Sequence, residues 1–284
     1  MAWEIALEVL DERGASEVQN WDHDGDASLL YWQQVQPKLA NAFVLVQQAQ
    51  ELNIKSRIAE VSPFLLLAGD PREWPRGCDK SDVPFSAFRT VDASDLIRLH
   101  NAVSAQRLSD SFATLYDEVR QHRNILMHHG HAGARIEPME ILRLTLTTHK
   151  HLFDGKWGPA RATYWNSGST ATLYTNKWTH DALLREFEAI VELLKPAELR
   201  EFFGYDKRQR HYLCPQCVMR ARDARVPLAE LRSRAKTESK LYCFLCNVEF
   251  EIERAKCSHA DCKSTVIALN YFNDRVCLTC DRVQ

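Results

Sequence analysis

Eight of the nine cysteines in this chain of 284 residues lie after residue 213, and they come in four close pairs. The pairs are Cys214-x-x-Cys217, Cys243-x-x-Cys246, Cys257-x4-Cys262 and Cys277-x-x-Cys280. A Cys-x-x-Cys turn directs two thiolates at one ion, and two such turns complete the closed shell that suits structural zinc. The four pairs therefore predict two structural Zn²⁺ ions, with all eight cysteines as ligands.

The spacing leaves open which pairs share an ion. The simplest assignment joins the first two pairs and then the last two, as two zinc ribbons in series, whereas an interleaved arrangement would use the same eight residues. His259 is available as a substitute for Cys257 or Cys262, but the full set of cysteines makes it a bystander. Disulfides are disfavoured, because close pairs in a cytosolic chain fit metal sites better. The ninth cysteine, Cys78, is expected to be a free thiol without a role.

Composition is that of an ordinary soluble protein, with 45% hydrophobic and 26% charged residues. No run of about 18 apolar residues is present that could span a bilayer, and the N-terminus lacks the pattern of a signal peptide. We therefore expect a cytoplasmic protein without a membrane segment.

The formal net charge of −2 is unevenly distributed. Residues 205–284 contain 15 Lys and Arg against 10 Asp and Glu, which leaves −7 for the first 204 residues. The basic residues concentrate between 206 and 240 and are Lys207, Arg208, Arg210, Arg220, Arg222, Arg225, Arg232, Arg234, Lys236 and Lys240. This basic segment is either a phosphate-binding surface or a solvated face with interspersed acids such as Asp223 and Glu230.

The first 204 residues are predicted to be helical almost throughout, and residues 205–284 form the zinc-binding domain. Helices are expected over 3–12, 27–54 as one or two helices, 93–104, 110–128, 138–153 and 178–194, with a last turn from 196 to 204. Pro37 is assigned to a first helical turn. A small β-hairpin is expected over 160–164 and 170–174, and loops over 21–26 and 70–84.

Residues 123–128, Arg-Asn-Ile-Leu-Met-His, end the helix expected over 110–128, with Gly130 and Gly133 as its stop signals. Upstream apolar residues at i, i+3, i+4 and i+7 spacing from Phe112 give this helix a core face. An arginine fork holds a phosphate, and a histidine titrating near neutrality moves protons, so this pair needs no metal. A histidine is also common at a helix C-terminus because the helix dipole favours its cation.

The segment resembles the Arg-polar-x3-His signature of HEPN ribonucleases, over roughly residues 90–155 and not in the zinc tail. The resemblance implies a mainly α fold, a HEPN-like bundle followed by the small cysteine-rich domain. It also implies a homodimer in which two motifs form one metal-independent site that cleaves RNA, with Arg123, His128 and Asn124 as its catalytic residues. By analogy it suggests bacterial stress response, a toxin–antitoxin pair or antiviral defence, with an antitoxin or regulatory partner.

Arg123 and His128 lie about 140° apart around an ideal helix, so one helix would not close both on the same phosphate oxygen. A second protomer, or a frayed last turn, would supply the missing geometry. Two classes of function remain open: an endoribonuclease, and a non-catalytic HEPN-like adaptor whose zinc tail binds nucleic acid or a protein.

Overall fold

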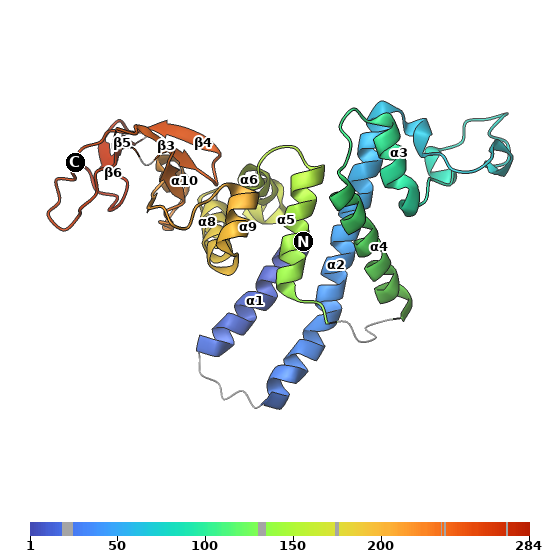
Figure 1. The fold of residues 1–284 in the computed structure, drawn as a ribbon, viewed down its shortest axis with the longest axis horizontal. Coiled ribbons are helices and arrows are strands. Elements are labelled where there is room, and N and C mark those ends of the chain that lie inside the picture. The colour runs from blue at the N-terminus through green and yellow to red at the C-terminus, as the bar shows by residue number, and fades with distance from the viewer. Residues whose placement is uncertain (19–24, 130–134, 174–175, 234, 236, 271) are drawn as a thin grey trace. The chain divides into compact units, whose positions relative to one another are not determined.

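The computed structural model describes residues 1–18, 25–129, 135–173, 176–233, 235, 237–270 and 272–284 (Figure 1). These residues form two compact units, Met1–Asp154 and Gly155–Gln284. Composition changes at residue 204, but the helices between 155 and 204 belong to the same compact unit as the cysteine-rich segment. Most of the loop expected over 21–26, and the stop signals Gly130 and Gly133, lie outside the described residues.

The first unit consists of five α-helices and four short 3-10 helices. The α-helices are α1 (Ala2–Val18), α2 (Gly25–Val61), α3 (Leu96–Val103), α4 (Asp110–His129) and α5 (Pro138–Leu152). The 3-10 helices, between α2 and α3, are η1 (Pro63–Leu66), η2 (Pro71–Glu73), η3 (Phe85–Ala87) and η4 (Ala93–Asp95). Helix α2 packs against each of the other four α-helices and is the central element of the unit (Figure 1). The mainly helical expectation is confirmed for this part of the chain.

The core of the first unit follows the helical periodicity of the sequence. Phe112 and Tyr116 of α4 are buried against Ile54 and Ile58 of α2, and the Tyr116 hydroxyl donates to the carbonyl of Ala93 at 3.0 Å. Each such buried side chain contributes about 1.5–3 kcal/mol through removal of apolar surface from water. This packing fixes which face of α4 points inward.

Pro37 does not begin a helix, contrary to the sequence expectation. It lies inside α2, which runs unbroken from Gly25 to Val61. A proline lacks the N–H that would bond the carbonyl four residues earlier, here that of Gln33. Both residues are exposed, so water can replace that hydrogen bond. Burial of apolar residues of α2 on either side of Pro37 outweighs the free-energy cost of the missing backbone hydrogen bond.

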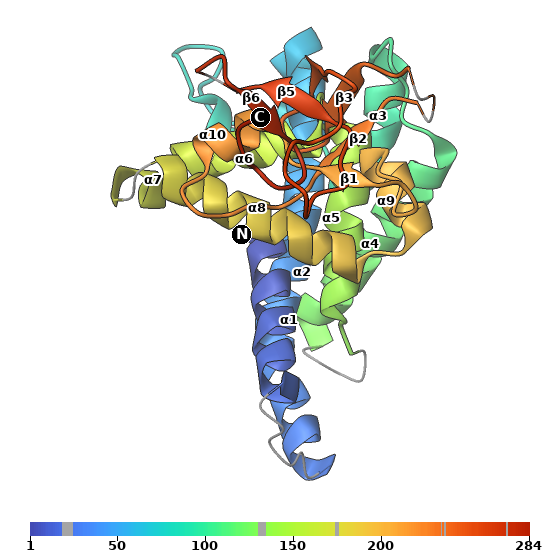
Figure 2. The same ribbon diagram turned by 90° about the vertical axis from the view of Figure 1, so that its left-hand side faces the viewer.

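The second unit contains helices α6 (Trp157–Ser167), α7 (Ser169–Leu173), α8 (Asn176–Leu193), α9 (Pro196–Phe203) and α10 (Pro215–Arg220) (Figure 2). An antiparallel sheet has the order β1 (His211–Tyr212), β2 (Ala229–Leu231), β3 (Lys240–Cys243) and β4 (Val248–Glu251). Strands β5 (Ile267–Leu269) and β6 (Arg275–Cys277) form a second, two-stranded antiparallel sheet. The cysteine-rich segment is therefore built from small sheets and one short helix.

The β-hairpin expected over 160–164 and 170–174 is wrong, because 160–164 lies in α6 and 170–173 in α7; residue 174 lies outside the described residues. The reason is a buried polar contact made by two residues that are four positions apart in the sequence. Arg161 donates to both carboxylate oxygens of Glu186 in α8, at 2.8 and 2.7 Å, and Trp165 Nε1 donates to the same carboxylate at 3.1 Å. Residues 161 and 165 reach one carboxylate only when they are one helical turn apart. This tertiary contact outweighs the β propensity of the neighbouring Thr and Tyr residues.

Candidate functional site

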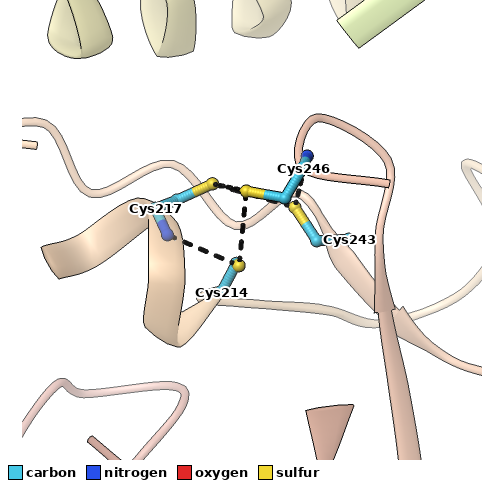
Figure 3. Close-up of side chains that lie close together, drawn as sticks. All are labelled: Cys214, Cys217, Cys243 and Cys246. Carbon is cyan, nitrogen blue, oxygen red and sulfur yellow. Dashed lines mark hydrogen bonds between the residues drawn. The ribbon is translucent and has the colours of Figure 1, made fainter. Parts of the chain in front are cut away.

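The first cysteine tetrad joins the N-terminus of α10 to the turn between β3 and β4 (Figure 3). Its four sulfur atoms lie within 4.8 Å of one another. The Sγ–Sγ distances are 3.8 Å from Cys217 to Cys243, 4.0 Å from Cys214 to Cys246 and 3.2 Å from Cys217 to Cys246. Four sulfurs around a tetrahedral zinc, each at about 2.3 Å, would be separated by about 3.8 Å. The tetrad is thus close to the size that zinc requires.

The second tetrad joins the 257–262 segment to the turn that follows β6. The Sγ–Sγ distances are 3.9 Å from Cys257 to Cys280 and 3.7 Å from Cys262 to Cys277. In both tetrads three cysteines are buried and the fourth is half-buried. The structure therefore pairs the cysteines in series, which excludes the interleaved arrangement. His259 lies outside the tetrad, with its Nε2 3.0 Å from the carbonyl oxygen of Val283.

Two of the Cys-x-x-Cys turns share one backbone design. Asn247 follows Cys246 and Asp281 follows Cys280, and both have positive φ angles, 54° and 57°. Their N–H groups donate to the carbonyls of Cys243 and Cys277, each at 2.9 Å. Asn and Asp are among the few non-glycine residues that adopt this left-handed conformation readily. The turn chemistry was readable from the sequence as an Asn or Asp directly after a Cys-x-x-Cys pair.

Both tetrads contain cysteines whose pKa is lowered: Cys243 in the first, and Cys277 and Cys280 in the second. Hydrogen bonds from the thiols of Cys214, Cys217 and Cys246 lower the pKa of the Cys243 thiol well below its ordinary value. Burial raises the pKa of Cys277, but the N–H groups of Cys280 and Thr279 outweigh it and lower this pKa to about 7. A lowered pKa favours the thiolate that a metal ion needs as a ligand, and binding of a metal ion displaces the remaining protons.

Helices α6 and α8 of the second unit contact the backbone segments that carry the first tetrad. A Cβ at Gly158, near the start of α6, would lie 2.4 Å from the carbonyl oxygen of Leu245, between Cys243 and Cys246. Asp181 of α8 is buried and accepts hydrogen bonds from the N–H groups of residues 222–224, the loop after α10, at 2.9 to 3.4 Å. Sequence analysis missed both residues, because their partners lie more than 40 positions away along the chain.

Four of the eight described basic residues in the segment 206–240 lie beside acids. Arg225 pairs with Asp281 at 2.7 Å, Arg222 with Asp223 at 3.2 Å, and Arg232 with Glu249. Lys240 lies 3.9 Å from the same Glu249 carboxylate. Arg234 and Lys236 lie outside the described residues. Of the two interpretations of this segment, the solvated face with interspersed acids accounts for Arg225, Arg232 and Lys240.

The motif residues Arg123 and His128 point in different directions from α4. Arg123 continues the core row of Phe112, Tyr116 and Val119; it is half-buried, and its Nε is buried without a hydrogen-bond partner among the described residues. Its Nη1 donates to Asn124 Oδ1 at 3.0 Å. His128 is exposed. No hydrogen bond joins these two side chains among the described residues.

The end of α4 carries exposed apolar residues. The exposed fractions are 49% for Ile125 and 61% for Met127. A cleft of about 400 Å³ lies nearby between α4 and α5 over Phe43, lined on its rim by Glu118, Glu140 and Arg143. Neither Arg123 nor His128 lines it.

No protein-family model, curated protein or solved structure matches this chain. No helix among the described residues is long and apolar enough to cross a membrane. All nine cysteines are free thiols, Cys78 among them. What the structure establishes is a helical unit, a second unit with a cysteine-rich tail, and two tetrads able to hold metal ions.

Proposed function

We propose that each tetrad binds one Zn²⁺ ion and that both ions are structural. The support is the donor set: four cysteine sulfurs per site, close to tetrahedral spacing, with three of the four side chains buried. Four thiolates fill the coordination shell of zinc and leave no position for a substrate or a water. Zinc at these sites stabilises the fold of the cysteine-rich tail and performs no chemistry there.

Metal analysis of protein purified under reducing conditions should return two zinc ions per chain, because each tetrad is complete. Cys257→Ser should reduce the count toward one, whereas Cys78→Ser, which changes a cysteine outside both tetrads, should leave it at two. Native mass spectrometry measures all three proteins. A metal-free chain with disulfides between the paired cysteines would contradict the proposal.

For the first unit, we propose a metal-independent endoribonuclease that acts as a homodimer. The observation that carries this proposal is the end of α4, where exposed His128 lies beside the exposed apolar residues Ile125 and Met127. Such residues are suited to burial against a second copy of the same helix across a two-fold axis. Arg123 of one chain and His128 of the other then share one cleft.

The chemistry requires only proton transfer and charge neutralisation. The 2′-oxygen attacks phosphorus as its proton passes to a histidine, and the bond to the 5′-oxygen breaks as that oxygen receives a proton from a histidine acting as acid. The product ends in a 2′,3′-cyclic phosphate. Arg123 neutralises the charge on the phosphate, and Asn124 holds the guanidinium in place through the 3.0 Å hydrogen bond.

Cleavage should fall by about 10²- to 10⁴-fold in His128→Ala, the contribution typical of a general acid or base, and to a similar extent in Arg123→Ala. Arg120→Ala is the matched control, because Arg120 lies on the same helix but is engaged by Asp117 at 2.6 Å. Total RNA is incubated with each protein, with and without chelator, and the new ends are mapped. Full activity in His128→Ala or Arg123→Ala would refute the mechanism.

The dimer should be detectable by light scattering across a dilution series. Ile125→Glu with Met127→Glu places charges in the proposed interface and should give monomers without cleavage activity. Two copies of Arg123 repel each other, so a non-cleavable RNA should shift the equilibrium toward dimer. A strictly monomeric protein that still cleaves RNA would show that one chain carries the whole site.

The alternative is a non-catalytic adaptor, and the position of Arg123 favours it. Burial of Glu51 in α2 opposes its ionisation, but hydrogen bonds from Lys55 and Gln47, and then the charges of Lys55 and Arg123, lower the pKa of this carboxyl. An arginine in a core row near a carboxylate can serve stability alone. In that case Arg123→Ala lowers the melting temperature of the first unit, and no variant changes RNA cleavage, because there is none.

A further inference from the structure

A guanidinium lies over an aromatic ring on the surface of the second unit. The guanidinium carbon of Arg222, in the loop after α10, lies 4.7 Å from the ring centre of Trp178 in the first turn of α8. Trp178 is 50% exposed, and the Arg222 side chain is 52% exposed. A cation above an indole is favourable by itself, and about half of each side chain is accessible to a ligand.

The Trp178–Arg222 pair is held in place by a buried anchor. Asp181 lies one turn after Trp178, is 6% exposed, and accepts the N–H of Arg222 at 2.9 Å and that of Ala224 at 3.2 Å. These N–H groups lower the pKa of Asp181, although burial raises it. The loop is therefore fixed relative to α8 before any ligand arrives, which reduces the entropy cost of binding.

The surroundings of the pair are basic. Arg185 of α8 acts on Asp181 by its charge, and Arg220 at the end of α10 acts in the same way on the neighbouring His180. Both arginines are exposed. The acids are Asp181, whose carboxylate faces the three N–H groups, and Asp223, 70% exposed and 3.2 Å from Arg222. Across the second unit, 21 Lys and Arg stand against 16 Asp and Glu.

We propose that Trp178 and Arg222 form a stacking platform for an unpaired base of single-stranded RNA, with Arg185 and Arg220 contacting the adjoining phosphates. This inference rests on the proposed function in taking RNA as the ligand. Single-stranded nucleic acids are bound by stacking of bases on aromatic rings and arginine planes within a basic groove. Bases in a duplex are stacked on one another and cannot reach the platform, so the surface should prefer single strands.

Binding is measured with the zinc-loaded full chain carrying His128→Ala, so that RNA is not consumed, by anisotropy of a labelled 12-nucleotide single strand. Trp178→Ala and Arg222→Ala should each weaken binding by roughly tenfold, within the range reported for loss of one base stack. Arg222→Lys keeps the positive charge but lacks the planar guanidinium, and should also weaken binding by nearly tenfold. Trp178→Phe keeps an aromatic ring, and its affinity should stay within about threefold of that of the parent. Arg89→Ala, which removes an arginine from an exposed 3.0 Å ion pair of the first unit, is the control and should bind as the parent does.

Several outcomes overturn the platform. The proposal would be wrong if Trp178→Ala and Arg222→Lys bound the single strand as tightly as the parent does. It would also be wrong if the parent bound a duplex of the same length equally well. Displacement of the RNA by poly-glutamate at equal charge, with the same losses in all variants, would identify a site for acidic protein instead. Because binding is read without cleavage, loss of the platform and loss of the nuclease are separate results: an active nuclease can fail this test, and an inactive chain can pass it.

Discussion

Chelation of zinc should unfold the cysteine-rich tail while the first unit stays folded. Binding of zinc to a structural site of this type contributes about 10–16 kcal/mol at neutral pH, whereas an entire domain is stable by only about 5–15 kcal/mol. The tail has few strands, and its buried apolar residues, such as Leu228, Leu241 and Val266, surround the two tetrads. Without an ion, nothing joins the four sulfurs of each tetrad, and the turns that carry them lose their link. The first unit has its own apolar core, in which α2 packs with four helices.

Hydrogen exchange read by mass spectrometry distinguishes these regions. Amides of β3 and β4 should lose protection on chelation or in Cys217→Ser, and amides in the middle of α2 should keep it. Cys78→Ser is the control for loss of a thiol, and the protection of its amides in both regions should equal that of the parent. Protected β3 and β4 amides in a chelated protein shown to be metal-free would mean that the tail folds without zinc.

Glu186→Ala should destabilise the second unit by about 3–5 kcal/mol, the usual effect of removing one partner from a buried ion pair. The side chains of Arg161 and Glu186 are each only 6% exposed, so the arginine would be left charged, buried and without its carboxylate. Trp165 would lose the acceptor of its 3.1 Å hydrogen bond as well. Urea denaturation of the zinc-loaded protein measures the loss.

Glu249→Ala is the matched control for that substitution. Glu249 also pairs with an arginine, Arg232, but these side chains are 43% and 46% exposed. Exposed pairs contribute about 0–1 kcal/mol, because water screens the charges. Equal losses of stability in the two variants would show that burial of the Arg161–Glu186 pair does not set its strength.

The metal ligands could be predicted from the sequence because a Cys-x-x-Cys pair is a local signal. The serial pairing was the simplest assignment and is confirmed. The sequence left the interleaved alternative open, because a Cys-x-x-Cys pair does not show which other pair shares its ion. The helices were predictable where apolar spacing is clear, as in α4 and α8. Prediction failed over 160–173, because the contacts that favour helices there are long-range: Gly158 lies against the backbone of Leu245, and Arg161 pairs with Glu186.

In α4, the apolar spacing predicts more than the core face, because it also predicts where Arg123 lies. Phe112, Tyr116 and Val119 define the inward face of α4, and the same spacing continues to Arg123. Burial of the Arg123 Nε follows from that spacing. Asp223 was visible in the sequence as an interspersed acid, but Asp281 and Glu249 could not have been assigned to Arg225 and Arg232, from which they are 56 and 17 residues away. Long-range ion pairs leave no local pattern.

The contact between Gly158 and Leu245 has a consequence for synthesis on the ribosome. The chain emerges from its N-terminus, so α6 and α8 are complete well before Cys246 leaves the exit tunnel. These helices cannot bury the face around Gly158 until the Cys243–Cys246 turn has formed. If that turn closes on zinc, as we propose, the supply of zinc during translation would set when the second unit becomes resistant to proteases, and the first unit would fold earlier.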